Sequence, residues 1–112
     1  MKYMFLLFDV ENEFHDLTED EQMKIIGEYA AFSEALLGAG AMIEGEPLDH
    51  TRNAKRIRGG RIEDGPFTDA KEQLGGYYVV EAKDLDAALD WAARCPAATY
   101  GFVEVRPLQL SE

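Results

Sequence analysis

The sequence has one cysteine and no long apolar run. Cys95 is the only cysteine, so no disulfide can form within the chain, as is typical of proteins of the reducing cytoplasm. The longest apolar run near the N-terminus, residues 3–8, is too short for the apolar core of a secretory signal. No segment approaches the roughly 18 apolar residues of a membrane-spanning helix. We therefore expect a cytoplasmic protein without a membrane segment.

Positive charge is also scarce. The chain has 11 Lys and Arg against 22 Asp and Glu, a net charge of −11. A phosphate backbone is repelled by such a protein, so we expect no nucleic-acid partner. Five of the basic residues nevertheless lie between Arg52 and Arg61. This local positive segment has two interpretations, an exposed hairpin protected by charge against edge pairing or an anion-binding site.

Metal-binding and catalytic motifs are missing as well. His15 and His50 stand alone, without a second histidine or cysteine at ligand spacing, so we expect no metal site. The acidic residues from Asp9 to Asp16 lack the glycine and spacing of a calcium loop and are interpreted as a solvated loop. The chain has no nucleophile elbow, Walker loop or dinucleotide-binding fingerprint, and no cofactor is expected.

What the sequence does contain is a regular alternation of strands and helices. With 112 residues, 46% of them hydrophobic, residues 1–112 suit a single domain. Thr18 and Glu21 form a capping-box pattern that opens a helix ending near Gly38 and Gly40. Asp84 caps a second, shorter helix, which Pro96 stops. Strands are predicted at residues 3–8, 41–48, 76–81 and 102–108, with Gly45 as a bulge and Pro47 as a sign of an edge strand.

A hairpin is predicted between the two halves of this pattern. Residues 54–58 and 61–63 flank Gly59-Gly60, a pair that suits a two-residue turn. The order β-α-β, hairpin, β-α-β is the split βαβ pattern of α+β proteins with a ferredoxin-like fold, in which both helices cover one face of an antiparallel sheet. Strands 3–8 and 76–81 are apolar on both faces, so the second face needs a cover too. We expect a second copy of the chain there, in a homodimer.

Four motifs carry a resemblance to a known family. They are the Asp64–Phe67 tetrapeptide DGPF, the segment Lys71–Tyr77, the helix end Trp91–Pro96 and the final strand Glu104–Pro107. Together, in this order and over essentially the whole chain, they resemble the DGPF branch of the YCII-related proteins. The resemblance implies a dimeric α/β-barrel type of fold. Some members of the branch resemble modules associated with extracytoplasmic-function sigma factors.

The resemblance also implies a candidate site, with one departure. YCII-type relatives are proposed to use a histidine of the first helix, followed by Leu and Gly at fixed spacing, with a nearby aspartate as an acid/base pair. Here Leu36 and Gly40 fit that spacing and Tyr29 stands at the place of the histidine. A phenol is a much weaker base than an imidazole at neutral pH, so the relatives' chemistry is not expected to carry over intact.

Four side chains are candidates for a site. Asp64 and Tyr29 are the candidate catalytic residues, and Lys71 and Arg106 the candidate substrate-binding residues. Each also has a structural interpretation: Asp64 as a turn residue, Tyr29 as a core residue, Lys71 as a surface residue, and Arg106 as the partner of Glu104.

Two functions therefore remain open, and with them the question of whether the protein is an enzyme. The first is binding or conversion of a small anionic or phenolic metabolite in a pocket between the first helix, the sheet and the Asp64 loop. The second is a non-catalytic interaction or regulatory module, for which the resemblance suggests a link to sigma-factor signalling.

Overall fold

The protein, seen in a computed structural model that describes residues 1–109, is a mixed α+β fold with an antiparallel sheet and three helices. Each predicted strand and helix forms. The elements are β1 (Lys2–Asp9), α1 (Glu19–Gly38), β2 (Met42–Pro47), β3 (Lys55–Arg58), β4 (Arg61–Asp64), β5 (Gln73–Glu81), α2 (Leu85–Arg94), α3 (Ala97–Tyr100) and β6 (Phe102–Pro107), with short 3-10 helices η1 (Phe14–Asp16) and η2 (Thr51–Asn53).

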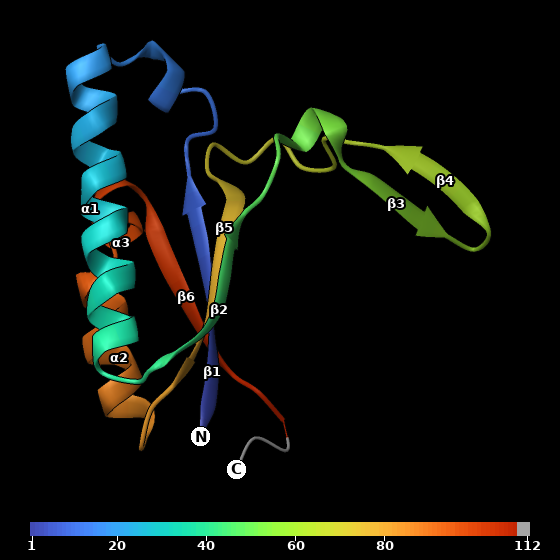
Figure 1. Ribbon diagram of the computed structural model, residues 1–112. Helices are drawn as coiled ribbons and strands as arrows, with labels where there is room; N and C mark the ends of the chain where they lie inside the picture. The colour runs from blue at the N-terminus through green and yellow to red at the C-terminus, as the bar shows by residue number, and fades with distance from the viewer. Residues whose placement is uncertain (110–112) are drawn as a thin grey trace.

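The main sheet has the strand order β2-β5-β1-β6, and every neighbouring pair is antiparallel. This order interleaves two βαβ units, as the ferredoxin-like prediction requires. The three helices lie on one face of the sheet, and the other face carries no helix (Figure 1). The predicted edge position of Pro47 is confirmed, because β2 ends the sheet.

Local sequence signals explain where the helices begin. Thr18 Oγ1 accepts the Glu21 backbone N–H at 3.2 Å, and the Glu21 carboxylate accepts the Thr18 backbone N–H at 3.2 Å, which completes the capping box of α1. The Asp84 carboxylate accepts the Ala87 N–H at 2.9 Å at the start of α2. The helices then bury one apolar face on the sheet, where the Phe32 ring meets Tyr78 edge-on at a centroid distance of 5.3 Å.

Gly45 has a different role from the predicted one. The irregularity of β2 lies between Met42 and Glu44, before the glycine. A Cβ at Gly45 would stand 2.5 Å from Cδ1 of the Tyr78 ring. The glycine is therefore needed for the close approach of an aromatic ring, and it does not form the bulge itself.

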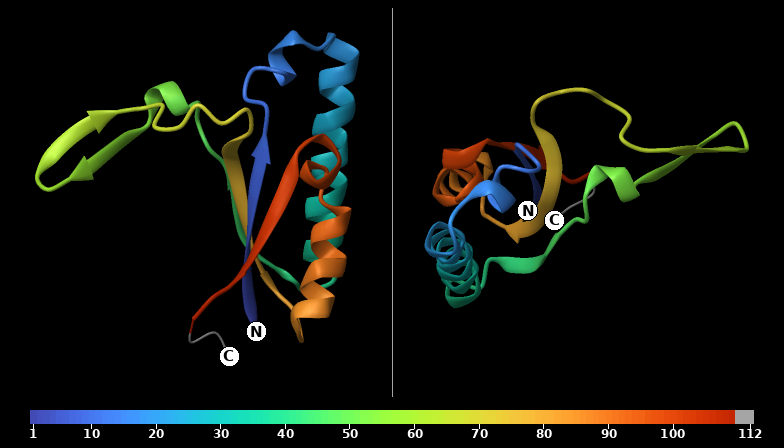
Figure 2. Two further views of the ribbon diagram at one scale, coloured as in Figure 1. Left: turned by 180° about the vertical axis from the view of Figure 1, so that it is seen from behind. Right: turned by 90° about the horizontal axis from the view of Figure 1, so that it is seen from above.

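The predicted hairpin forms a separate two-stranded ribbon, β3 and β4, which we call the arm (residues 55–64). Gly59 and Gly60 have φ angles of 56° and 80°, values that a two-residue hairpin turn requires and that glycine adopts without strain. The arm projects from the end of the sheet, away from the helices (Figure 2).

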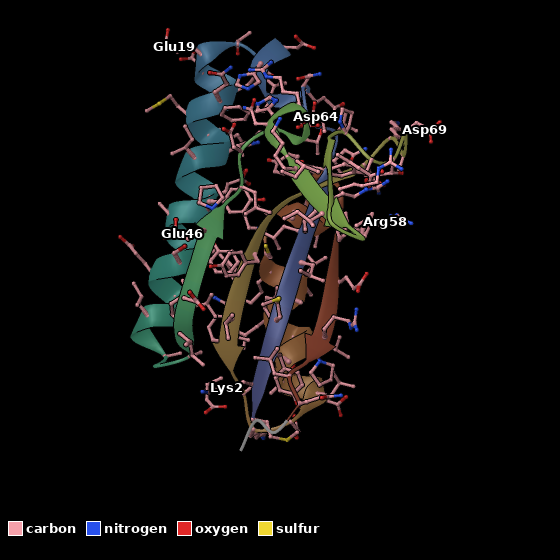
Figure 3. The ribbon with its side chains drawn as sticks, turned by 90° about the vertical axis from the view of Figure 1, so that its right-hand side faces the viewer. Lys2, Glu19, Glu46, Arg58, Asp64 and Asp69 are labelled. Atoms are coloured by element: carbon pink, nitrogen blue, oxygen red, sulfur yellow. The ribbon has the colours of Figure 1, made fainter. Side chains whose placement is uncertain are left out.

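The face of the sheet opposite the helices, here called the open face, is apolar at its centre. Alternation along the strands places Met4, Leu6 and Phe8 of β1 on this face, beside Tyr77 and Val79 of β5. Phe8 stacks on Phe102 with ring centroids 4.5 Å apart. Seen from this side, the arm stands in front of the sheet (Figure 3).

Candidate functional site

Asp9 is the last residue of β1 and places a carboxyl group at the end of that strand. Tyr3, Phe5 and Leu7 point toward the helices, and Asp9 continues the same alternating row past the end of the apolar core. Its side chain accepts no hydrogen bond from any residue between 1 and 109. The interpretation of the segment as a solvated loop is therefore wrong at Asp9, which is partly buried.

The surroundings of Asp9 favour its neutral form. Burial raises the pKa of the Asp9 carboxyl, and the neighbouring carboxylates of Glu11, Glu13 and Glu72 raise it further. A carboxyl with a raised pKa can take up and return a proton closer to neutral pH than an ordinary aspartate can.

The glycine pair before the strand residues Tyr77 and Tyr78 makes room for this carboxyl. A Cβ at Gly75 would stand 3.3 Å from Asp9 Oδ1, and one at Gly76 would stand 3.2 Å from the Glu46 carbonyl oxygen. The pairing of β1 with β5 shifts register at the same place, between Leu7 and Phe8. Gly75 therefore lets β5 pass close to the Asp9 carboxylate.

Tyr29 lies opposite, on α1. Its ring packs against the apolar core, and burial is the main reason that the pKa of its phenol lies above the usual tyrosine value, with Cys95 and Asp9 adding smaller effects. The phenol therefore stays protonated at neutral pH. In this state it is a hydrogen-bond donor and cannot serve as a general base.

Asp9 and Tyr29 border the same two cavities. The first, of about 410 Å³, lies between η1, the start of α1 and α3, and the second, of about 370 Å³, lies between α1, β2 and β5. Both volumes lie within the range of small-molecule sites. Lys24 and Tyr100 line the first cavity, and Ser33, Met42 and Tyr78 line the second.

The polar groups of the second cavity are held by one another. Ser33 Oγ and the Tyr78 hydroxyl oxygen are 3.0 Å apart and share a hydrogen bond. Burial raises the pKa of the Tyr78 phenol, against a smaller lowering by Ser33. Because Asp9 and Glu46 also line it, the cavity offers hydroxyl and carboxyl groups beside apolar walls, an arrangement suited to a neutral ligand that donates hydrogen bonds.

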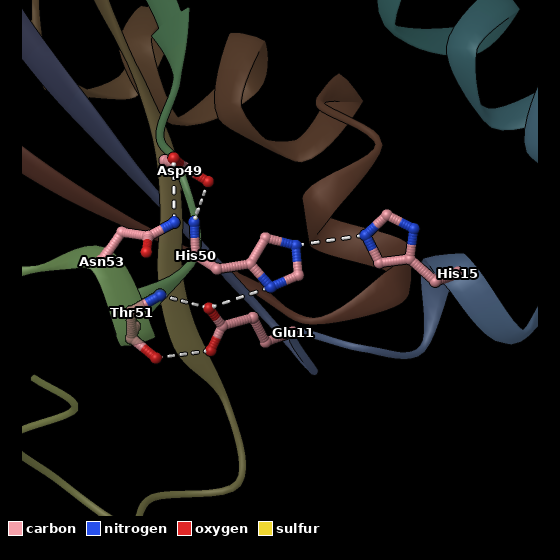
Figure 4. A network of polar contacts seen from close by, with 6 residues as sticks. All are labelled: Glu11, His15, Asp49, His50, Thr51 and Asn53. Atoms are coloured by element: carbon pink, nitrogen blue, oxygen red, sulfur yellow. Dashed lines mark hydrogen bonds and ion pairs between the residues drawn. The ribbon is translucent and has the colours of Figure 1, made fainter.

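A histidine pair adjoins the same carboxyl. His15 Nε2 and His50 Nε2 are 3.1 Å apart (Figure 4). Both residues line a smaller cavity of about 170 Å³ that Asp9 also borders. The expectation that the two histidines stand alone is wrong in space. They are separated by 35 positions in the chain, and only the folding of two loops brings them together.

Glu11 joins these two loops. Its carboxylate accepts hydrogen bonds from the backbone N–H and, at 2.7 Å, from the hydroxyl of Thr51, and it lies 3.6 Å from His50 Nδ1 (Figure 4). The Thr51 hydroxyl is the main cause that lowers the pKa of Glu11. The loop after β1 is thereby tied to η2 at the base of the arm.

The other predicted site residues lie elsewhere. Asp64 ends β4, where its carboxylate accepts a hydrogen bond from Lys55 Nζ at 2.6 Å, and its side chain is 75% exposed. Lys71 lines a shallow hollow beside Phe8 and Phe102 on the open face. Arg106 is exposed and pairs with Glu104 at 3.2 Å. These three residues share no cavity with Tyr29 in the described part of the chain.

Asp9 is a candidate site residue that the sequence analysis does not name. The alternation of Tyr3, Phe5 and Leu7 predicts which face of β1 turns toward the helices, and Asp9 has the same parity. The strand alternation therefore indicates that Asp9 faces the helices, whereas the run of acidic residues that follows it favours the interpretation as a solvated loop.

Two negative findings hold for residues 1–109. No group of three or more His, Cys, Asp or Glu side chains is arranged to hold a metal ion. No helix in this range has the length and apolar character needed to cross a membrane.

Comparisons with known proteins place the chain. An uncharacterised protein of Rhizobium meliloti strain 1021 is 32% identical over 116 residues, spanning 98% of this chain and 94% of that protein. A solved structure of 5-chloro-2-hydroxyhydroquinone dehydrochlorinase from Burkholderia phenoliruptrix, in complex with 2,5-dihydroxybenzoquinone, superposes with a TM-score of 0.57 at 16% identity, covering 99% of this chain and 96% of that one. The model of the YCII-related domain matches residues 1–110. The chain therefore belongs to the YCII-related family.

Proposed function

We propose that the cleft at Asp9 and Tyr29 binds a small phenol- or quinone-like metabolite. The observation that carries this proposal is the Asp9 carboxyl, which is partly buried, has a raised pKa and accepts no hydrogen bond from residues 1–109, yet borders two cavities of ligand size. A carboxyl group in such surroundings is suited to a ligand that brings a hydroxyl donor.

The charge of the cleft favours a phenol over a strongly anionic ligand. The carboxylates of Glu13 and Glu21 line the first cavity with Lys24 as the one cation among its lining residues, and Glu46 lines the second. An added anion would meet several negative charges there. The fold neighbour is named for an activity on a chlorinated hydroxyhydroquinone and holds a dihydroxybenzoquinone, which is a single-ring compound of a size that these cavities can hold.

The two groups suggest complementary roles. Ionised Asp9 accepts the hydroxyl proton of the bound phenol, while the neutral Tyr29 hydroxyl donates a hydrogen bond to the oxygen on which negative charge develops. Tyr29 cannot act as the general base in place of Asp9, because the raised pKa of its phenol keeps it protonated. The proposal thus retains Tyr29 as a site residue and replaces Asp64 with Asp9 as the acid/base group.

A titration tests this proposal. We expect hydroquinone, whose hydroxyl groups are protonated at neutral pH, to bind in isothermal titration calorimetry, with affinity reduced about tenfold or more in Asp9→Asn and in Tyr29→Phe. Asp64→Asn is the matched control, because its exposed carboxylate contacts Lys55 far from the cleft. Equal affinities in the wild type and Asp9→Asn would reject the role of Asp9, and an absence of binding across a set of phenols would reject the ligand class.

We also propose that a second copy of the chain covers the open face. Met4 and Leu6, both half-buried in the single chain, lie at its apolar centre, and the three helices of residues 1–109 all cover the opposite face. Apolar surface of this kind is stabilised by association. Light scattering is expected to give the mass of a dimer for the wild type and of a monomer for Leu6→Glu. A wild-type monomer at micromolar concentration would reject the dimer.

A non-catalytic interaction module remains the alternative. One observation favours it: the arm exposes Ile57 and Ile62, which have exposed fractions of 74% and 73%. Exposed apolar pairs on a projecting ribbon are typical of contact surfaces.

A further inference from the structure

The arm is a two-faced ribbon. Its strand register sets Ile57 opposite Ile62 and Lys55 opposite Asp64, so these four side chains share one face. The other face holds Arg56 opposite Glu63 and Arg58 opposite Arg61. One face is thus apolar toward the tip, and the other is crowded with guanidinium groups.

Within the described chain the isoleucine face is uncovered, and the arginine face is covered only in part, at Arg56. Ile57 and Ile62 are about three-quarters exposed. An isolated two-stranded ribbon is marginally stable in water, so an arm of this kind needs a surface against which to pack. The arm is held at its base instead: the Gly65 N–H donates to the Ala54 carbonyl oxygen at 2.8 Å, and the Arg56 guanidinium lies over the Phe67 ring at 4.4 Å.

The positive charge of the arm is only partly neutralised. Glu63 accepts from Arg56 Nε at 2.5 Å and lies 3.7 Å from Arg58, so one carboxylate serves two guanidinium groups. Arg61 makes no ion pair with any residue in the range 1–109. The two arginines next to the turn, Arg58 and Arg61, stand directly opposite each other, an arrangement that is unfavourable without a nearby anion.

The rest of the chain has the opposite charge. Residues 52–64 contain five basic and two acidic residues, which leaves six basic and twenty acidic residues for the remainder. The arm and the body of the molecule are therefore electrostatically complementary. The arm projects away from its own body on the side of the open face, so it lies apart from its own helices (Figures 1 and 2).

We propose that the arm of each copy clasps the acidic body of a second copy seated on the open face. This inference rests on the proposed homodimer and deepens it. Ile57 and Ile62 are buried against the second copy, and Arg58 and Arg61 reach its carboxylates from the tip of the ribbon. The arm thereby extends the interface beyond the two sheets, and its positive charge is the feature that makes an acidic chain a suitable partner for itself.

Sedimentation velocity over a concentration series tests the clasp. The double variant Ile57→Thr and Ile62→Thr keeps β-branched side chains in the strands while removing the apolar pair. We expect the dimer dissociation constant to rise about tenfold or more. Ile26→Thr, which alters another half-exposed isoleucine on α1, is the matched control and is expected to leave the constant unchanged.

A variant that reverses the charge of the arm tests the clasp independently. Arg58→Glu with Arg61→Glu is expected to weaken the dimer about tenfold or more at low salt, and the loss is expected to shrink as salt rises because the lost attraction is electrostatic. Placing the same substitutions in the Leu6→Glu monomer checks the fold. Its thermal unfolding is expected to change little, because Arg61 makes no ion pair within its own described chain and the long Arg58–Glu63 ion pair is exposed to solvent.

Limited trypsin digestion locates the contact on the arm. Cleavage after Arg58 and Arg61 is expected to be slow in the concentrated wild-type dimer and fast in Leu6→Glu, where the arm is free. Dissociation constants within twofold of the wild type for both arm variants, with Leu6→Glu still monomeric, would overturn the clasp and leave the sheet dimer standing. A monomeric wild type would reject both the sheet dimer and the clasp. Ligand binding at Asp9 is tested separately, by the calorimetric titration.

Discussion

A Cβ placed on Gly75 would come within 3.3 Å of Asp9 Oδ1. This separation is tighter than most side-chain contacts, so any residue larger than glycine at position 75 must displace the carboxyl at the centre of the cleft. The glycine of β5 and the acid of β1 therefore form one structural unit, although they are far apart in the chain.

Gly75→Ala is expected to disturb the site more than the fold. The added methyl group shifts the Asp9 carboxyl by a few tenths of an ångström and weakens binding of hydroquinone roughly tenfold, because a displaced acid or base group loses its alignment with the ligand. Calorimetric titration measures the effect. Gly38→Ala, where a Cβ meets nothing within 4 Å, is the control and is expected to bind as the wild type does. Equal affinity in Gly75→Ala would show that the Asp9 position is not critical.

Asp9→Asn is expected to stabilise the unliganded protein at neutral pH. The folded-state pKa of Asp9 is raised, so the ionised carboxylate destabilises the folded protein at pH values above that pKa. Below the ordinary aspartate pKa the carboxyl is protonated in both the folded and the unfolded state, and the destabilisation disappears. The variant should therefore unfold at higher urea than the wild type at pH 7, and the difference should fade as the pH is lowered through the raised pKa. A pH-independent difference in the urea midpoint would contradict this origin.

Gly45→Ala is expected to destabilise the fold. The new methyl group would overlap the Tyr78 ring, whose Cδ1 and Cε1 atoms lie 2.5 and 2.9 Å from the ideal Cβ position. Overpacking of this kind costs about 1–3 kcal/mol of unfolding free energy. Urea unfolding monitored by circular dichroism measures the loss.

Gly27→Ala, unlike Gly45→Ala, is expected to raise the free energy of unfolding. Gly27 lies inside α1, and a Cβ there meets nothing within 4 Å. Alanine restricts the unfolded chain and favours the helix, which stabilises the protein by about 0.5–1 kcal/mol. Urea unfolding at neutral pH is again the measurement. A loss of stability in this variant would indicate that the outer side of α1 contacts a partner.

The fold could be predicted from the sequence because its signals are local. The Gly59-Gly60 turn, the capping box at Thr18 and the two-sided strands each depend on residues within a few positions of one another. These signals fix the order of the elements, and the right-handed connections of a split βαβ pattern leave few ways to arrange them.

The site could be predicted only in part because it depends on distant residues. Tyr29 is named by its spacing to Leu36 and Gly40, which the resemblance to YCII-type relatives supplies, and its part in a site stays a prediction. The contact between His15 and His50 depends on two loop conformations that no periodicity encodes. The turn motif makes Asp64 a candidate, but in the structure its carboxylate contacts Lys55 across the hairpin, a partner that only the strand register reveals.

Glu11→Gln is expected to loosen the base of the arm in a pH-dependent way. The lowered pKa of Glu11 means that its carboxylate stabilises the fold above the ordinary glutamate pKa, and that this contribution is lost as the pH falls through the native-state pKa. At pH 7 the variant replaces a charge-assisted hydrogen bond from the Thr51 hydroxyl with a neutral one, a loss of about 1 kcal/mol.

The difference in unfolding free energy between the wild type and Glu11→Gln should therefore be largest near neutral pH and approach zero in acid. Urea titrations at several pH values measure it. Glu13→Gln is the control, since this residue of the same loop makes no side-chain hydrogen bond within residues 1–109. Hydrogen exchange at the Thr51 amide should rise in Glu11→Gln alone, and a rise of equal size in Glu13→Gln would point to the general charge of the loop as the cause.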